Sequence, residues 1–314
     1  MEHARTSIAK GSKSFALASR LFDRTTREWA WLLYGWCRVC DDIADGQDHG
    51  GAMVPVGAGV VRLAEMRAKT DAALCGETIG DTAFDGLGVV ARECGLPARF
   101  AHDVIDGFAL DAVKWRPQST DDLLRYCYHV AGAVGLMMAV VMGVSPDDET
   151  TLDRACDLGL AFQLANIARD VGEDAAAGRC YIPRDWLDEF GIVPDTLMNR
   201  ENRPKLAHVG ARLAAMAALY EGSARHGTPA LSFRSSWAVL AAAGIYGDIA
   251  REVARRGEGA WDARVITSKR AKLCWVMQAL GQAMVRRGRW PARDIRNPAL
   301  WCRPMQENPD GRER

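Results

Sequence analysis

Two short stretches of the sequence each carry a pair of aspartates spaced four residues apart. Asp41 and Asp45 lie in the segment DDIAD, and Asp170 and Asp174 lie in the segment RDVGED. On a helix, residues i and i+4 share a face, so each segment points two carboxylates in one direction. Like charges at that spacing destabilise a helix by a few tenths of a kcal/mol. We therefore expect a cation to compensate each pair.

The expected helix ends make these carboxylates still less favourable without a ligand. Gly46 follows the first segment and Gly178 follows the second at a short distance. Both segments are thus predicted near helix C-termini, where the negative end of the helix dipole repels anions. All-oxygen ligands select a hard ion, and Mg²⁺ is held by one or two carboxylates plus substrate phosphates. The sequence predicts such a metal site, for Mg²⁺ or alternatively Mn²⁺; the other interpretation is two solvated acidic helix ends.

The surroundings of both segments favour the metal site. The first segment follows the largely apolar run Trp29–Trp36, and Arg38 lies three residues before Asp41. The second segment ends a polar stripe on a helix otherwise rich in Leu, Ala and Ile, formed by Gln163, Asn166, Asp170 and Asp174. A polar stripe inside an apolar helix needs partners. Metal-bound diphosphate is a good leaving group, and an apolar pocket shields the resulting carbocation from water.

The overall charge of the chain excludes one class of function. Its 314 residues include 40 Lys+Arg and 40 Asp+Glu, so the net charge is zero. Zero net charge argues against a nucleic-acid binder that works by bulk electrostatics. The charges are nevertheless divided, with 20 basic and 30 acidic residues over 1–200 and 20 basic and 10 acidic residues over 201–314. Such an asymmetry is itself informative, because the basic portion is free to face diphosphate or an anionic membrane.

Helical periodicity dominates the sequence and predicts one all-α domain over residues 1–302, with a disordered tail over 303–314. Helices are expected over about 25–45, 97–115, 120–143, 151–177, 204–226, 233–257 and 267–288. Thr25 to Glu28 predict a capping box, and Asp45–Gly59 predicts a surface loop. One apolar stripe runs along the last helix and consists of Leu273, Met277, Leu280 and Met284.

The cysteines and the apolar segments indicate a cytoplasmic protein. The nine cysteines are scattered and odd in number, which is typical of buried thiols in a reducing compartment. Cys37 and Cys40 form a CxxC without the second half of a zinc set. The N-terminal residues contain no apolar signal-peptide region. The longest apolar stretch, Ala131–Val144, is shorter than a bilayer-spanning helix of roughly 18–20 residues and predicts a buried core helix.

Several further motifs occur in a consistent order around the aspartate segments. They are GSKSF from Gly11, LYGWCR from Leu33, YCYHVAGAVG from Tyr126, the stretch Leu158–Asp174, and GRCYIP from Gly178. On these motifs the chain resembles the squalene/phytoene synthase family, from about residue 10 to about residue 257. Within that family it is most similar to the bacterial phytoene synthases.

The resemblance implies a fold and a reaction. The fold is a single-domain isoprenoid-synthase helical bundle with a central apolar cavity. The reaction is head-to-head condensation of two geranylgeranyl diphosphates, through a cyclopropylcarbinyl diphosphate, to phytoene as the first committed step of carotenoid biosynthesis. NADPH is not expected. The alternative function is that of a C30 synthase, which makes dehydrosqualene, hydroxysqualene or squalene from farnesyl diphosphate. A remote alternative is a non-catalytic family member that acts as an assembly or binding factor.

The resemblance also implies roles for particular residues. The metal-binding positions are Asp41, Asp45, Asn166, Asp170 and Asp174. The diphosphate-facing positions are Ser12, Lys13, Arg38, Arg169 and Arg179. Gln163 matches a polar group of the cavity, Phe15 a cavity aromatic, and Tyr126 and Tyr246 match tyrosines near the leaving diphosphate. Arg264 and Lys269 lie where some members place a phosphate-binding base, although a solvated face is the interpretation that we favour for them.

The substrate's tails and the product's lack of any polar group suggest contact with the inner face of a membrane. The segment Ala263–Arg296 carries basic residues beside Trp275 and Trp290, and basic residues with aromatics can seat a helix at an anionic interface. A solvated basic face on a core helix is the alternative. The other partners that we expect are neighbouring carotenoid-pathway enzymes, and no nucleic acid.

Overall fold

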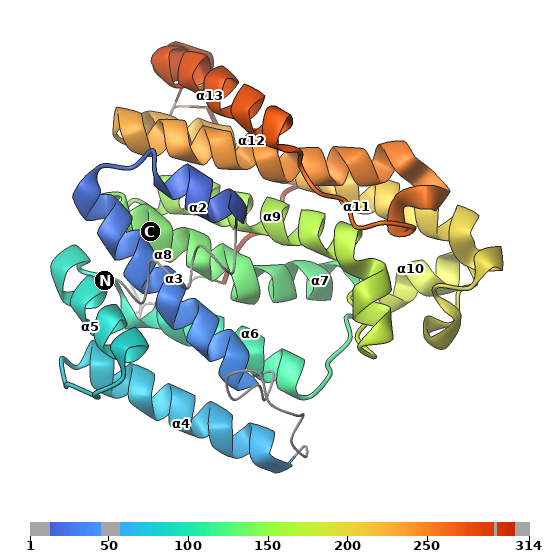
Figure 1. The fold of residues 1–314 in the computed structure, drawn as a ribbon, viewed down its shortest axis with the longest axis horizontal. Coiled ribbons are helices and arrows are strands. Elements are labelled where there is room, and N and C mark those ends of the chain that lie inside the picture. Colours follow the sequence, from blue (N-terminus) through green and yellow to red (C-terminus); the bar gives the residue numbers. More distant parts are fainter. Residues whose placement is uncertain (1–12, 45–56, 292–293, 305–314) are drawn as a thin grey trace.

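A computed structural model describes residues 13–44, 57–291 and 294–304, and every regular element in these ranges is helical (Figure 1). The predicted all-α class is therefore confirmed. The α-helices are α2 (Lys13–Ser19), α3 (Arg24–Ala44), α4 (Gly57–Leu74), α5 (Thr82–Cys94), α6 (Ala98–Ala112), α7 (Thr120–Cys127), α8 (Ala133–Val141), α9 (Glu149–Ala176), α10 (Arg184–Glu189), α11 (Arg203–Ala224), α12 (Phe233–Arg256) and α13 (Lys269–Arg289).

The long helix α9 is the element around which the others pack. It contacts α8, α11 and α12, and it runs through the middle of the bundle (Figure 1). Glycines bring α8 and its preceding turn very close to α9. A Cβ atom at Gly135 would lie 2.4 Å from the main-chain oxygen of Ala155, and one at Gly159 would lie 2.3 Å from that of Ala131. Only glycine permits this approach, which fixes the two helices that carry much of the cavity described below.

Most of the predicted helices are present, with small changes at their ends. The helices predicted over 151–177, 204–226, 233–257 and 267–288 correspond to α9, α11, α12 and α13. The predicted capping box of α3 is wrong, because the cap comes from Asp23 instead. Its carboxylate accepts hydrogen bonds from the Thr26 main-chain nitrogen at 3.0 Å and from Thr26 Oγ1 at 2.7 Å.

Three differences concern regions between those helices. The helix predicted over 120–143 is interrupted by a π-helical turn at Tyr128–Gly132, a type of turn that is frequent at functional sites. The loop predicted over Asp45–Gly59 is wrong at its end, since α4 begins at Gly57; residues 45–56 lie outside the described residues. Helices α2, α4, α5 and α10 had no counterpart in the prediction.

The most apolar helical stretch belongs to the core, as the sequence predicts. Residues 120–141 are long and apolar enough to cross a membrane by length and composition alone. Most of this stretch is buried inside the protein, where α8 packs against α6 and α9. Its composition therefore follows from its position in the core.

The chain returns to α9 after α13, and ion pairs hold the returning segment in place. The Asp157 side chain is 0% exposed, and Arg296 donates to its two oxygens from Nε at 2.9 Å and from Nη2 at 2.7 Å. Ser223 Oγ donates to the same carboxylate at 2.5 Å. Arg303, where we expected the tail to begin, is buried and pairs with Asp153 at 2.8 Å. Residues 305–314 lie outside the described residues.

We predict that Arg296→Ala lowers the free energy of unfolding by about 3–5 kcal/mol, because it leaves the fully buried Asp157 carboxylate without its cation. Denaturant unfolding followed by circular dichroism measures the change. The control is Arg24→Ala, which removes an exposed pair with Glu28 and should leave the unfolding midpoint in place. Equal midpoints for both variants would show that the buried pair does not stabilise the fold.

Candidate active site

The structure brings both aspartate segments to one polar cavity of about 440 Å³. The C-terminal part of α3 supplies Arg38 and Asp41, and the C-terminal half of α9 supplies Asn166, Asp170 and Asp174. The described aspartates of the two segments, Asp41, Asp170 and Asp174, thus lie around one cavity although they come from different helices. Asp45 and Ser12 lie outside the described residues.

The α3 side of the cavity has its own counter-charge. The Arg38 guanidinium donates to Asp41 at 2.9 Å and to the neighbouring Asp42 at 2.5 Å. These three residues lie within one turn at the C-terminal end of α3, and their side chains are about half exposed. Arg38 therefore holds the Asp41 carboxylate at the cavity wall, beside the space that a charged ligand would enter.

The α9 side of the cavity is more buried and more strongly acidic. The pKa of Asp174 is raised to about 7, chiefly by burial and also by the nearby Asp170 carboxylate, while the Arg179 guanidinium opposes the shift. Asp170 accepts hydrogen bonds from Arg169 Nε at 2.7 Å and pairs with Arg264 at 3.0 Å. The charged form of Asp174 is thus unfavourable in this partly buried position.

This donor set fits a hard divalent cation. Asp41, Asn166, Asp170 and Asp174 offer oxygen ligands around one cavity, and oxygen ligands suit Mg²⁺ and Mn²⁺. Burial, and secondarily the Asp170 carboxylate, raise the pKa of Asp174, so a cation bound here would favour its charged form. Asp45 would add a further carboxylate by its sequence position, four residues after Asp41.

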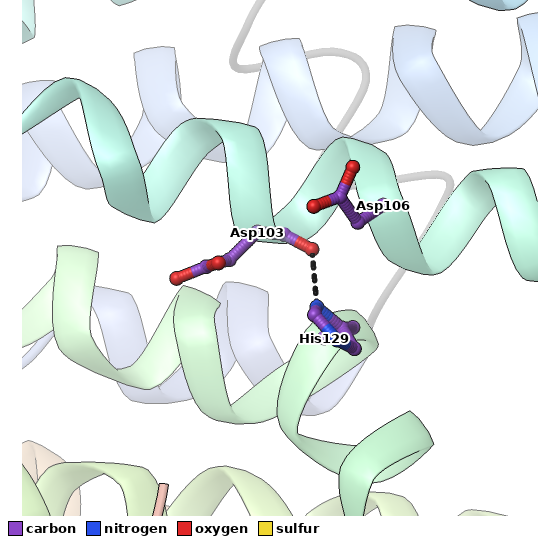
Figure 2. A group of neighbouring side chains, drawn as sticks. All are labelled: Asp103, Asp106 and His129. Carbon is purple, nitrogen blue, oxygen red and sulfur yellow. Dashed lines mark hydrogen bonds between the residues drawn. The ribbon is translucent and has the colours of Figure 1, made fainter. Parts of the chain in front are cut away.

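A second acidic group lies elsewhere on the surface and belongs to the scaffold (Figure 2). Oxygens of Asp103 and Asp106 and a ring nitrogen of His129 lie within 4.8 Å of one another. Each carboxylate has a protein partner, since Tyr128 donates to Asp103 at 2.5 Å and Arg67 donates to Asp106 at 2.5 Å. His129 Nδ1 is hydrogen-bonded to the main-chain oxygen of Asp103, as Figure 2 shows. This group does not line the aspartate cavity.

An apolar cavity of about 380 Å³ continues inward from the polar one. The two cavities share lining residues, namely Tyr34, Cys37, Val130, Gln163 and Asn166. The inner cavity is enclosed by α2, α3, α8, α9 and α12 and is lined almost entirely by apolar side chains.

The polar side chains of α9 mark the boundary between the two cavities. Gln163 and Asn166 line both spaces, whereas Asp170 and Asp174 line only the outer one. Tyr246 extends from α12 into the inner cavity and stacks on Phe162 of α9, with ring centroids 4.3 Å apart. An aromatic ring at this place can stabilise a cation in the apolar space.

Two residues of the polar cavity were not predicted, Asp111 and Tyr181. Tyr126, which was predicted, donates to Asp111 Oδ1 at 3.0 Å, and Tyr181 donates to the same oxygen at 2.7 Å. The two phenol rings stack with centroids 4.7 Å apart. Asp111 therefore orients both hydroxyls at the cavity wall. It lies alone near the end of α6, so no local pattern could have identified it.

The remaining predicted residues lie in several places. Arg179 lines the aspartate cavity, and its role beside the diphosphate stays a prediction. Arg169 lines a neighbouring polar cavity of about 620 Å³, together with Arg116, Arg179 and Arg264. Arg264 and Lys269 are both exposed, as expected of a solvated face, and Arg264 also pairs with Asp170 and Glu173.

Two further predicted residues, Lys13 and Phe15, belong to α2 through their main chains. Their side chains lie outside what the structure describes. Their predicted roles beside the diphosphate and the cavity therefore stay predictions.

We predict that Asp174→Asn stabilises the metal-free protein at pH 8 by about 1–3 kcal/mol. Because the pKa of Asp174 in the folded state is about 7, well above its ordinary value, the charged carboxylate destabilises the fold above that pH. The gain should shrink as the pH falls below 7, where the carboxyl is protonated in the folded protein.

Thermal unfolding in EDTA at pH 8 and pH 5 measures this effect. Asp188→Asn on the exposed face of α10 is the control, since its carboxylate is 60% exposed and pairs only with Arg184 among the described residues. A loss of stability for Asp174→Asn at pH 8 would mean that the carboxylate is already compensated by the protein.

Comparison with known proteins adds independent evidence to this geometry. The family model described as "Squalene/phytoene synthase" matches residues 8–273. A phytoene synthase of Pseudescherichia vulneris is 46% identical over 307 residues, which cover 97% of this chain and 98% of that protein. A 15-cis-phytoene synthase of Pantoea ananas is 44% identical over 307 residues, with the same coverage of both chains.

Solved structures agree in fold. A dehydrosqualene synthase crystallised with a ligand superposes with a TM-score of 0.80 at 26% identity, covering 90% of this chain and 96% of that one. The squalene synthase HpnC from Alicyclobacillus acidocaldarius gives a TM-score of 0.72 at 24% identity, covering 82% and 93%. The helical arrangement described above is therefore that of known prenyl-condensing enzymes.

Proposed function

The chain belongs to the squalene/phytoene synthase family, and we propose that it is a phytoene synthase that joins two molecules of geranylgeranyl diphosphate. The observation that carries this proposal is the continuity of two cavities. A polar mouth that holds both aspartate segments opens directly into an apolar interior. A prenyl diphosphate has the same division, with a charged head and a long apolar tail.

The reaction that we propose has two ionisation steps. One substrate molecule loses diphosphate, and its allylic cation alkylates the 2,3 double bond of the second molecule. Loss of a proton from the resulting cation closes the three-membered ring and gives a cyclopropylcarbinyl diphosphate. This intermediate loses its diphosphate in turn, and the cation rearranges. Loss of a proton then gives phytoene with a central double bond. Since no hydride is added, the reaction needs no NADPH.

The residues of the polar mouth would bind and orient the diphosphate. Arg38 from α3 and Arg179 from the segment after α9 both line the cavity and would provide donors for phosphate oxygens. Asp41, Asn166, Asp170 and Asp174 would hold Mg²⁺, or Mn²⁺ in its place. Bound there, the ion neutralises charge on the departing diphosphate. Tyr126 presents its hydroxyl to the same space, held by Asp111.

The apolar interior would protect the cationic intermediates. Leu33, Val134 and Leu158 exemplify its lining, which is mostly apolar. Exclusion of water prevents the cation from being quenched as an alcohol. Tyr246 and Phe162 form a stacked aromatic wall beside this path and would stabilise positive charge as it migrates.

We place this enzyme in the cytoplasm, with peripheral contact to the inner face of the membrane. Both the substrate tails and the C40 product are apolar, so an enzyme at a lipid surface can exchange them without passage through water. Neighbouring enzymes of the carotenoid pathway would act on the product at the same surface.

The deciding experiment is product analysis. Purified protein supplied with geranylgeranyl diphosphate and Mg²⁺ should release a C40 triene in the absence of NADPH, detected by chromatography and mass spectrometry. EDTA should abolish the product. Parallel reactions with farnesyl diphosphate test the alternative C30 synthase; turnover of that C15 substrate alone would overturn the assignment of chain length. The absence of any condensation product with either substrate would favour a non-catalytic role.

We also expect Asp41→Ala combined with Asp45→Ala to lower kcat by about 10³-fold or more, because the metal loses carboxylate ligands where charge develops on the leaving group. Far-UV circular dichroism should show unchanged helix content. Asp121→Ala, an exposed aspartate on α7, is the control and should keep its turnover. Activity retained by the double variant would contradict the metal assignment.

A further inference from the structure

The apolar stripe of α13 faces solvent instead of the core. Leu273 is 63% exposed, Met277 is 58% exposed and Met284 is 66% exposed. Leu280, between them along the same face, is half-buried. The stripe therefore continues over three turns on the outside of the molecule, where α13 is the outermost helix over α12 (Figure 1).

A different face of α13 packs onto the protein. Ala279 and Ala283 are fully buried in a small cluster with Leu240 and Ala241 of α12. Trp237 of α12 donates from Nε1 to the main-chain oxygen of Val276 at 2.8 Å. Since these contacts fix α13 in place, rotation of the helix cannot bury the stripe. The exposed apolar face is a built feature of the folded protein.

The charged residues that the helix α13 itself carries are all basic. Residues 263–293 contain eight basic residues and no acidic one. Lys269, Arg270, Arg287 and Arg289 are exposed near the two ends of the helix. Among the residues that the structure describes, no acidic side chain pairs with any of these four. The surface thus combines apolar side chains with unneutralised positive charge.

We propose that α13 docks this protein on an anionic lipid bilayer, with Leu273, Met277 and Met284 inserted at the interface. Basic side chains beside an apolar stripe complement anionic headgroups above an acyl layer. This proposal identifies the surface that makes the membrane contact proposed above. It rests on the proposed function only for the reason to dock, which is that the substrate tails and the product are apolar.

Docking through α13 places the apolar cavity one helix away from the lipid. α12 lies between them, packing against α13 on one side and lining the cavity with Ala238, Val239 and Ala242 on the other. The polar mouth, formed by α3, α6 and the C-terminal half of α9, belongs to other elements. The enzyme could therefore be seated on the bilayer while diphosphate enters from the aqueous side.

Vesicle flotation of the full chain tests this proposal. Vesicles of phosphatidylglycerol and phosphatidylcholine should float the wild-type protein at low salt, and pure phosphatidylcholine should bind it far less. Met277→Glu with Met284→Glu should reduce binding to the anionic vesicles by about tenfold or more. Arg270→Gln with Arg287→Gln should reduce it by about fivefold per charge removed. The matched control is Val61→Glu on α4, a side chain with the same 58% exposure as Met277 at the opposite edge of the bundle.

The outcomes separate docking from catalysis. Turnover of detergent-dispersed substrate by the α13 variants should equal that of wild type, so loss of flotation with retained turnover supports the proposal. Equal flotation of wild type and the Met277/Met284 variant, or no flotation of wild type, overturns it. A third result would also overturn it. If light scattering shows that the wild-type protein is a dimer, if this dimer does not float, and if the Met277/Met284 variant is a monomer, then a second copy of the chain covers the stripe. A protein that floats but makes no C40 product would refute the proposed reaction alone.

Discussion

The gathering of carboxylates at the polar mouth is the constraint on which the rest of this structure depends. Asp41 on α3 and Asp170 and Asp174 on α9 line one space, and on α9 the Asp170 carboxylate makes the charged form of Asp174 less favourable. Arg38 compensates the α3 side, and Arg169 and Arg264 compensate Asp170. Asp174 retains a pKa of about 7 because burial and Asp170 outweigh the effect of Arg179. A divalent cation held among these carboxylates would offset the cost of the charged form.

Such a site must be held together by packing at a distance from the charges. α9 supplies the rigidity, since Gly135 and Gly159 allow α8 and its preceding π-helical turn to contact it closely. The Asp157–Arg296 pair fixes the N-terminal half of the same helix to the returning C-terminal segment. These particular contacts lie along the N-terminal half of α9, which carries none of the predicted metal-binding residues. This division lets the C-terminal half carry an unfavourable charge arrangement without loss of the fold.

The sequence predicted what local periodicity encodes. The i, i+4 spacing identified Asp41 on one helix and Asn166, Asp170 and Asp174 on one face of another. In the structure these four residues lie around one cavity. Asp111 could not be identified in this way, because its role comes from contacts with Tyr126 and Tyr181 that are distant in sequence. Arg169 was assigned to the diphosphate by resemblance, yet its side chain lines the neighbouring cavity. Side-chain direction at the end of a helix depends on tertiary neighbours that a single sequence does not reveal.

The stripe on α13 shows the limit of periodicity most clearly. Leu273, Met277 and Met284 repeat as a core-facing stripe would, but small residues on another face, Ala279 and Ala283, make the contact with α12. Apolar spacing shows that a face avoids water without showing what covers it. The neighbouring basic residues supply that information, since a face packed in a protein core would not be bordered by unpaired positive charge. The division of the chain into an acidic first part and a basic last part therefore follows the architecture: the acidic clusters surround the polar mouth, and much of the excess base lies on the outermost helix.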